Sequence, residues 1–459
     1  MVLEEMAELT TGLGPGFRGQ VIMPGAPDYD RARRINNASV DRHPALIVRP
    51  TDADDVALVV AQTQEQGLPL VVRAGGHSMA GHGTADGALV LDLSEMRDVE
   101  IDAVGRTAWA DAGILAGEYT AATHALGFVT PFGDTGSVGV AGITLGGGVG
   151  WLVRKHGMTI DSLLAVEIVT ADGRQRTASA VEEPDLFWAV RGAGANFGVV
   201  TRLQFRLHPL ENVLAGDIVY PATHDVLRGL VPALLAAPDE LTAMPYIMLA
   251  PRDAAIPDEH HGRLVVSVSV AWSGTPDASE RALAPLRALG SPISDTVAWK
   301  PYPDLFSPVD RDAEPTWAIS SRGLFVDSLD DAMTDVIQRR LTDPGAPEAL
   351  VQLRVLGGEM ARVPADAAAF GWRDQPLLLW LITPDHDIGR AADLEAWTAA
   401  FHAELAANGA ATYVNFMGDE GADAVRDAYP ASSYARLREL KRRYDPDNVF
   451  RANHNILPA

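Results

Sequence analysis

The chain has 459 residues, 47% of them hydrophobic, which is enough for two or three domains with large buried cores. Asp and Glu outnumber Lys and Arg by 61 to 37, and the net charge of −24 argues against nucleic acid or an anionic membrane as a partner. Without cysteine the chain has no disulfide, Cys-zinc site or thiolate nucleophile, and we expect no bound metal. The opening MVLEEMAELT lacks a signal-peptide pattern and no apolar run reaches about 18 residues, so we expect a cytoplasmic protein.

Residues 44–125 are predicted to alternate strands and helices. Apolar spacing predicts a helix over 52–66, a strand over 68–72 and a second helix over 110–126. The stretch 71–78, VVRAGGHS, predicts a buried strand that runs into a two-glycine turn with a histidine directly after it. Glycines let a ligand approach the backbone closely, and the N–H groups of such a turn form an anion-binding concavity. This turn is therefore a candidate phosphate cradle with His77 at its rim.

A second glycine-rich segment, TGSVGVAGITLGGGVGW, covers residues 135–151. Its spacing does not match the G-x-G-x-x-G pattern of a Rossmann dinucleotide site, which opens a helix after the first strand. Two glycine turns that are each tied to a strand suit a long ligand with a pyrophosphate in its middle. We expect the two turns to bind one such cofactor together.

Residues 211–410 change in character. Strands are predicted at 215–220, 244–249, 264–272, 350–355 and 377–382, with helices at 279–288 and 327–341 between them. This pattern predicts an antiparallel sheet with helices on one face, in an α+β architecture. The other face would roof an active site, and the Pro- and Asp-rich loop 307–315 is a candidate mobile segment.

Several motifs together resemble one known family. They are PALIVRP at 44–50, RAGGHS at 73–78, GGGVGWL at 146–152, DLFWAVRGAG at 185–194, and YDPDNVFR at 444–451 followed by NHNI at 453–456. On these motifs the chain resembles the berberine-bridge-enzyme-like oxidases of the vanillyl-alcohol-oxidase superfamily, and within it the bacterial 6-hydroxynicotine-oxidase type. The resemblance covers nearly the whole chain.

The resemblance implies a PCMH-type FAD-binding domain of two α+β subdomains at 1–210, a substrate domain at 211–410, and a C-terminal segment, 411–459, that returns to the FAD-binding domain. It implies FAD bound covalently through His77. Many relatives have a second tether from a cysteine, where this chain has Thr135, so a single attachment is expected. Val138 matches a valine that leaves room for O2 beside the flavin. The other expected cofactor-binding residues are Arg73, Gly75, Gly76, Ser78, His82, Gly139, Gly142, Thr144, Gly146, Gly147, Gly148, Gly150, Val169, Asn415, Asn453 and Asn455.

The family's usual catalytic base is missing. In many relatives it is the last tyrosine of a Tyr-x-Asn-Tyr motif, but residues 413–416 read YVNF, and Phe416 cannot accept a proton. If this segment is a strand, Tyr413 faces away from the flavin when Phe416 faces it. Candidate catalytic residues on the substrate sheet are Tyr246, Gln352, Arg354 and His261, each with an ordinary structural interpretation as well. Five aromatic residues are candidates for lining the substrate pocket: Trp299, Tyr302, Trp317, Trp372 and Trp380.

The leading hypothesis is an FAD-dependent oxidase that takes a hydride from a CH–OH group of a small molecule, such as a sugar, glycoside or secondary metabolite, and passes the electrons to O2 to give H2O2. An amine (CH–NH) oxidase of the hydroxynicotine type is the runner-up within the class. Two further hypotheses are a dehydrogenase with poor O2 reactivity and a non-catalytic protein that binds flavin or another ligand. The sequence leaves the substrate and the oligomeric state open.

Overall fold

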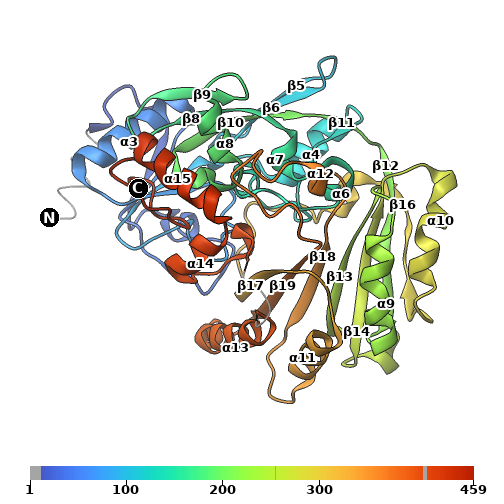
Figure 1. Ribbon diagram of the computed structural model, residues 1–459. Coiled ribbons are helices and arrows are strands. Elements are labelled where there is room, and N and C mark those ends of the chain that lie inside the picture. The colour runs from blue at the N-terminus through green and yellow to red at the C-terminus, as the bar shows by residue number, and fades with distance from the viewer. Residues whose placement is uncertain (1–11, 254, 407–410) are drawn as a thin grey trace.

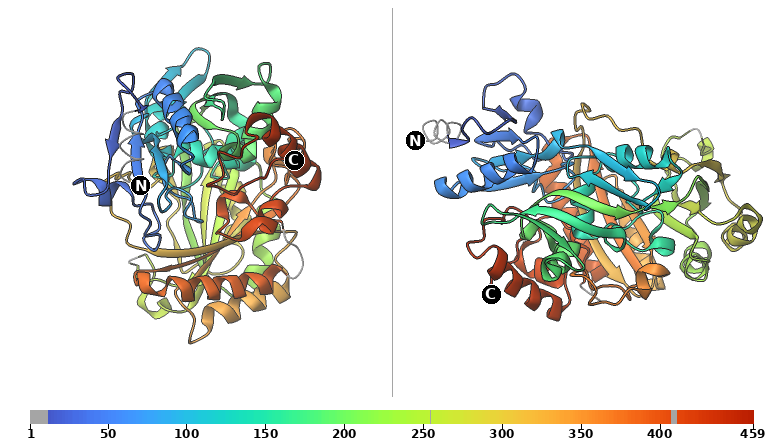
Figure 2. Two further views of the ribbon diagram at one scale, coloured as in Figure 1. Left: turned by 90° about the vertical axis from the view of Figure 1, so that its left-hand side faces the viewer. Right: turned by 90° about the horizontal axis from the view of Figure 1, so that it is seen from above.

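The computed structural model describes residues 12–253, 255–406 and 411–459. Two sheets from the N-terminal part of the chain lie on one side of the molecule, and a large third sheet lies on the other (Figure 1). The C-terminal segment runs back onto the N-terminal sheets, as its red ribbon beside the blue and green elements shows (Figure 2). Within the described part of the chain, no helix has the length and apolar character that crossing a membrane requires.

The first sheet has four strands in the order β1-β2-β4-β3, and β2, β4 and β3 run parallel. Its parallel strands are short runs of Leu, Val and Ile, as expected for strands covered on both faces. Helix α3 (Ala53–Gln66) begins because the Asp52 carboxylate accepts hydrogen bonds from two backbone N–H groups, and it ends at Gly67, whose φ is +67°. The strands are β1 (Gln20–Ile22), β2 (Leu46–Arg49), β3 (Leu70–Arg73) and β4 (Leu89–Asp92), and helix α2 (Tyr29–Ala32) precedes β2.

The second sheet has five antiparallel strands in the order β5-β6-β10-β8-β9. The helix predicted over 110–126 is wrong at its start, because residues 107–111 pair with β10 as a strand, and α4 begins only at Ala116. The strands are β5 (Val99–Asp102), β6 (Thr107–Asp111), β8 (Leu163–Val169), β9 (Gln175–Ser179) and β10 (Val199–Arg206). The accompanying elements are α4 (Ala116–His124), α5 (Val140–Gly146), α6 (Val153–His156), α7 (Thr159–Ser162), α8 (Pro184–Ala193) and the small β7–β11 pair (Phe128–Val129, His208–Pro209).

The third sheet is antiparallel and eight-stranded, with the path β15-β12-β14-β13-β18-β19-β17 and β16 beside β12. Its strands are β12 (Asn212–Pro221), β13 (Leu241–Leu249), β14 (Leu264–Trp272), β15 (Ser294–Asp295), β16 (Ala298–Pro301), β17 (Ala318–Val326), β18 (Leu350–Val355) and β19 (Leu377–Asp385). Helices α9 (His224–Leu235), α10 (Pro276–Arg287), α11 (Asp331–Thr342) and α13 (Ala391–Leu405) cover its outer face (Figure 1). The predicted α+β fold is therefore confirmed.

Alternation along β18 and β19 gives this sheet two different faces. Val351, Leu353 and Val355 are buried in the apolar core beneath the helices. The alternate residues of the two strands point to the opposite face, toward the N-terminal part of the molecule. Arg354 on β18 and Trp380 on β19 are examples. The face left free of helices therefore carries Arg354 and Trp380 together with apolar side chains such as Leu378 and Ile382.

The C-terminal segment contains α14 (Gly421–Asp427) and α15 (Ala431–Tyr444), while the short α12 (Glu359–Arg362) precedes β19. The Lys441 ammonium and the Asp445 carboxylate of the last turn lie 2.7 Å apart and are fully buried. Lys441 also donates hydrogen bonds to the carbonyls of Asn196 (2.7 Å) and Phe450 (2.9 Å). This ion pair fastens the end of the chain to the wall of the cavity described next.

Candidate active site

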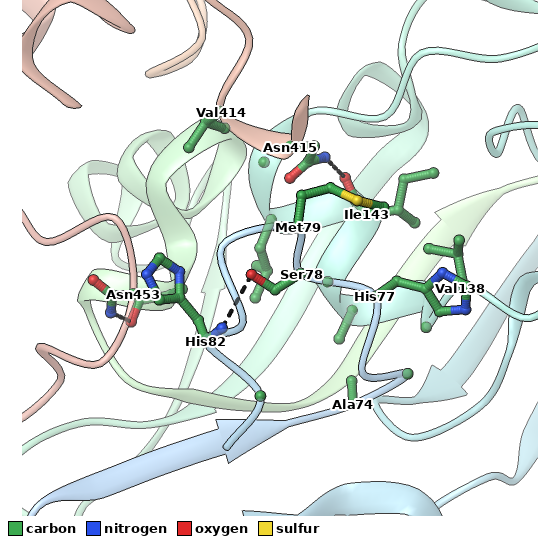
Figure 3. A pocket seen from close by; sticks show the side chains of 18 of the residues that line it. Ala74, His77, Ser78, Met79, His82, Val138, Ile143, Val414, Asn415 and Asn453 are labelled. Carbon is green, nitrogen blue, oxygen red and sulfur yellow. Dashed lines mark hydrogen bonds between the residues drawn. The ribbon is translucent and has the colours of Figure 1, made fainter. Parts of the chain in front are cut away.

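A cavity of about 620 Å³ runs between the two N-terminal sheets and the free face of the third sheet. Its wall combines both glycine turns, residues 413–417 and the C-terminal residues 450–454. Figure 3 shows His77 beside Val138 at one end of this pocket and His82 near Asn453 at the other. Segments that are far apart in the sequence therefore form one elongated site.

The two glycine turns touch each other backbone to backbone. A Cβ atom on Gly75 would lie 2.2 Å from the nitrogen of Gly139, and a Cβ on Gly139 would lie 2.4 Å from the nitrogen of Gly75. The next residue, Gly76, has a φ of +71°, a conformation that side chains with a Cβ rarely adopt. Only glycine satisfies the close approach, which explains why both turns are glycine-rich where they meet.

His77 forms part of the cavity wall and is half-buried. Burial lowers the pKa of its imidazole to about 4, while a hydrogen bond with the backbone of Ser137 acts in the opposite direction. The ring is therefore neutral at pH 7, with a nitrogen lone pair available to an electrophile in the cavity. This is the protonation state that covalent attachment to a cofactor requires.

Most of the expected cofactor-binding residues line the cavity. Those in the wall are Arg73, Gly75, Gly76, His77, Ser78, His82, Thr135, Val138, Gly139, Gly142, Gly146, Asn415 and Asn453. The others lie outside the lining. Among them, the Thr144 hydroxyl donates to a carbonyl of its own helix, and Gly148 donates its N–H to Tyr413, which lines the cavity. The residues outside the lining are Thr144, Gly147, Gly148, Gly150, Val169 and Asn455.

Two charged or titratable pairs stabilise the wall. The Arg73 guanidinium lies 2.8 Å from the Asp92 carboxylate, and both are buried. The rings of His82 and His454 meet edge to face with centroids 4.6 Å apart. Burial lowers the pKa of His454 to about 3, and the neighbouring His82 adds to this effect, so this end of the cavity holds neutral imidazoles at pH 7.

The segment 413–416 is not a strand, so the expectation that Tyr413 faces away from the site is wrong. Residues 414–416 form a short 3₁₀ helix, and Tyr413 and Phe416 both line the cavity with ring centroids 5.1 Å apart. The Tyr413 hydroxyl accepts hydrogen bonds from the N–H of Gly148 (2.7 Å) and the amide of Asn415 (2.9 Å). Burial raises the pKa of Tyr413 to about 12, so its phenol stays protonated and supports the second glycine turn.

Three of the four catalytic candidates form one chain of hydrogen bonds on strands β13 and β18 of the third sheet. The Gln352 amide donates to the Tyr246 hydroxyl at 2.5 Å, and Arg354 donates to the Gln352 carbonyl oxygen at 2.9 Å. Arg354 reaches the cavity itself, whereas Tyr246 and Gln352 lie behind it. His261 is elsewhere: its ring bonds the carbonyl of Ile256 at 2.9 Å in a surface loop, so the structure does not bring it to the site.

Of the five aromatic candidates for the pocket wall, only Trp380 lines this cavity. Trp299 is exposed, and Trp317 stacks on His386 with ring centroids 3.4 Å apart. Tyr302 is buried in a separate apolar cluster, and the Trp372 indole donates to the carbonyl of Ala428. None of these four residues is therefore part of the cavity wall.

The most informative residue that the sequence reasoning missed is Asp134. It lines the cavity directly before Thr135, and it lies 2.7 Å from the Arg354 guanidinium. A signal was present, because Asp134 is the only Asp, Glu, Lys or Arg between Glu118 and Arg154. Other lining residues that were not anticipated are Asn36, Leu145, Gly198, Val200, Ile319, Ile382 and His454.

The cavity fits FAD. Its volume of about 620 Å³ is in the range of ligand pockets, and both glycine-rich turns contribute residues to its lining. Two of its lining residues carry a buried polar atom, Asn453 Oδ1 and Trp380 Nε1, that has no hydrogen-bond partner among the described residues. Buried polar atoms are nearly always paired, so a polar group on a bound molecule would supply the partner that these residues lack.

Comparisons with known proteins agree with this geometry. A family model described as "FAD binding domain" matches residues 44–179, and one described as "Berberine and berberine like" matches residues 412–457. The (R)-6-hydroxynicotine oxidase of Paenarthrobacter nicotinovorans is 32% identical over 96% of this chain and 97% of the relative. An uncharacterized FAD-linked oxidoreductase of Bacillus subtilis is 29% identical, over 96% and 97%.

Solved structures show the same fold. The crystal structure of 6-hydroxy-D-nicotine oxidase from Arthrobacter nicotinovorans superposes with a TM-score of 0.84 at 28% identity, covering 98% of this chain and 99% of that chain. A xylooligosaccharide oxidase from Myceliophthora thermophila superposes with a TM-score of 0.86 at 23% identity, covering 100% and 99%. At that lower identity the likeness concerns the fold alone.

The fold and the cavity define an FAD-dependent oxidoreductase with a PCMH-type FAD-binding domain. More specifically, the chain belongs to the FAD-linked oxidoreductases of the berberine-bridge-enzyme-like family.

Proposed function

We propose that this protein oxidises a CH–OH group of a small molecule, such as a sugar, glycoside or secondary metabolite, with FAD held covalently through His77 alone and O2 as the electron acceptor. FAD, when bound, accepts a hydride from the substrate C–H bond and passes two electrons to O2, which leaves as H2O2. The observation that carries the proposal is the single cavity that joins the neutral His77 to the polar face of the substrate sheet.

The chain's own residues supply binding, orientation and proton handling. The glycine turns offer backbone N–H groups to the phosphates, and a neutral His77 offers its ring nitrogen for the tether. By the family resemblance, Thr135 matches the position where many relatives have a second, cysteine tether, and a hydroxyl cannot replace a thiolate there. Val138, in the wall beside His77, supports O2 access because its side chain is small.

The charge that Arg354 brings to the cavity is compensated by Asp134, whose carboxylate lies 2.7 Å away and is the more exposed member of the pair. A carboxylate held in this way can accept the proton of an alcohol O–H, and this favours an alcohol as the substrate. An amine that binds in its neutral form needs no such acceptor. Amine oxidation is kept as a second candidate by one specific observation, the 32% identity to (R)-6-hydroxynicotine oxidase.

The test is anaerobic mixing of the purified flavoprotein with cellobiose, xylobiose, chitobiose and (R)-6-hydroxynicotine, followed by admission of air. Loss of the oxidised flavin absorbance with a sugar, then rapid recovery with one H2O2 per flavin, supports the proposal. Reduction only by the amine favours amine oxidation. Slow recovery in air assigns a dehydrogenase, and no reduction by any substrate refutes catalysis of this kind.

A further inference from the structure

The corner of the cavity where relatives carry the catalytic tyrosine is filled by rings and a cation. Phe416 stacks on Trp380 with ring centroids 4.1 Å apart and planes 8° from parallel. The guanidinium of Arg354 lies 5.2 Å from the centre of the Phe416 ring, on which it packs as a cation–π pair. None of these three groups accepts a proton, so a base for alcohol oxidation must come from another residue.

Asp134 is the only Asp or Glu among the described residues that line this cavity. Its Oδ2 accepts a hydrogen bond from Arg354 at 2.7 Å, and its Oδ1 accepts one from the Thr135 hydroxyl at 3.1 Å. The Asp134 side chain is 19% exposed whereas Arg354 is 2% exposed, so the carboxylate is the member of the pair that a substrate can reach.

Arg354 is itself held rigidly. Its other N–H groups donate to the Gln352 side chain at 2.9 Å and to the Val149 carbonyl at 3.1 Å. The guanidinium therefore fixes the Asp134 carboxylate beside the Phe416 corner, which is the preorganisation that proton transfer requires. Arg354 cannot take the proton, because a guanidinium has only N–H donors and no acceptor atom.

The other candidates on the substrate sheet are unsuited to be the base. Burial, and then the charge of Asp134, raise the pKa of Tyr246 to about 12, so its phenol remains protonated at neutral pH. The Gln352 amide has no basic group and already bridges Tyr246 and Arg354. The imidazoles of His82 and His454 pack on each other, and burial lowers the pKa of both, so they are weak bases.

We propose that Asp134 is the catalytic base and that Arg354 is the positioning residue that holds it; this inference rests on the proposed alcohol oxidation. The substrate O–H bond breaks and its proton goes to the Asp134 carboxylate. The carbon that bears this oxygen would lose its hydrogen together with the C–H electron pair, as a hydride that FAD would accept when bound, and the C–O bond would become C=O. The alcohol is thereby oxidised by two electrons to a carbonyl compound.

The first variant is Asp134→Asn, which keeps the shape of the side chain and an oxygen for Arg354 but has no basic group. With the compound from the panel above that reduces the wild-type flavin fastest, we expect the limiting rate of anaerobic flavin reduction to fall about 10²–10⁴-fold. Reoxidation by O2 in the same sample should be unchanged. A reduction rate within threefold of the wild type overturns the proposal.

The second variant is Asp134→Ala, which leaves room for a small anion beside Arg354. We expect formate and acetate to restore flavin reduction, acetate more strongly because it is the stronger base. Nitrate has the same planar shape as formate but is not basic, so it should bind without restoring the rate. Equal rescue by nitrate would show that Asp134 only neutralises Arg354, which contradicts the proposal.

Binding provides a readout that does not depend on turnover. Calorimetric titration should show formate and nitrate binding to Asp134→Ala but not to the wild type, and no binding to the variant would overturn the placement of the pair at the cavity.

Glu118→Ala, which removes an Arg311-bound carboxylate outside the cavity, is the matched control and should show neither effect. A wild-type flavin that no panel compound reduces refutes the proposed function and this inference with it, whereas an active wild type with an unimpaired Asp134→Asn refutes this inference alone.

Discussion

The buried ion pair at the end of α15 gives the strongest stability prediction. Lys441 and Asp445 are both 0% exposed, and Lys441 donates three hydrogen bonds, to Asp445 and to two backbone carbonyls. In Lys441→Met the Asp445 carboxylate remains buried with only two backbone N–H donors, from Val449 and Phe450. Removing one partner of a buried pair costs about 3–5 kcal/mol, because the other charge is left uncompensated.

Urea unfolding followed by tryptophan fluorescence would measure this loss. Arg442→Met is the matched control, because Arg442 is the next residue on the same helix and is exposed, so it should change the free energy of unfolding by less than about 0.5 kcal/mol. The double variant Lys441→Met/Asp445→Asn should recover part of the loss, since it no longer buries an unpaired charge. If Lys441→Met is no less stable than Arg442→Met, the reasoning is refuted.

Three further predictions follow from the wall of the cavity and its surroundings. Gly75→Ala should abolish flavin retention, because the new Cβ would lie 2.2 Å from the nitrogen of Gly139, and a normal flavin-to-protein absorbance ratio would contradict this. Tyr413→Phe should cost about 1–3 kcal/mol in thermal or chemical denaturation, since a buried glycine N–H loses its acceptor, and an unchanged melting temperature would argue against that role. His156 and His208 stack at 3.9 Å, and burial, the largest cause in each case, lowers their pKa values to about 3 and about 4 from 6.5. As the pH falls below 6.5, both histidines gain a proton in the unfolded chain before they do in the folded protein. Their contribution to the free energy of unfolding is therefore full above pH 6.5 and falls toward pH 4 by about 1.4 kcal/mol per pH unit for each histidine. Melting curves of the double Gln variant should show a shallower pH slope than the wild type, and equal slopes would exclude this origin.

Regular segments were predictable from the sequence because their patterns are local. Strands 264–272 and 350–355 agree with β14 and β18 to the residue, since each is a run of branched or alternating apolar residues. The helix over 52–66 agrees because the Asp52 cap and Gly67 mark its two ends. The glycine turns and His77 were found for a similar reason, because their composition is unusual over a short stretch.

The features that the sequence did not predict depend on contacts that no periodic pattern encodes, most of them between residues far apart in the chain. Tyr413 turns into the cavity because its hydroxyl binds Gly148, a contact that spans 265 positions and overrides strand alternation. The Asp134 carboxylate is positioned by a hydrogen bond from Arg354, which lies 220 positions further along the chain. His261 sits at the start of a predicted strand, but its ring is satisfied by a carbonyl five residues away, which a periodic pattern cannot indicate.

Covalent attachment of FAD through His77 is the central claim, and acid precipitation of the purified protein tests it most directly. The account predicts that the yellow colour stays in the denatured pellet of the wild type. It predicts that His77→Ala releases its flavin to the supernatant, because Thr135 offers no second tether. Flavin that leaves the wild-type pellet, or that stays in the pellet of His77→Ala, would contradict the account.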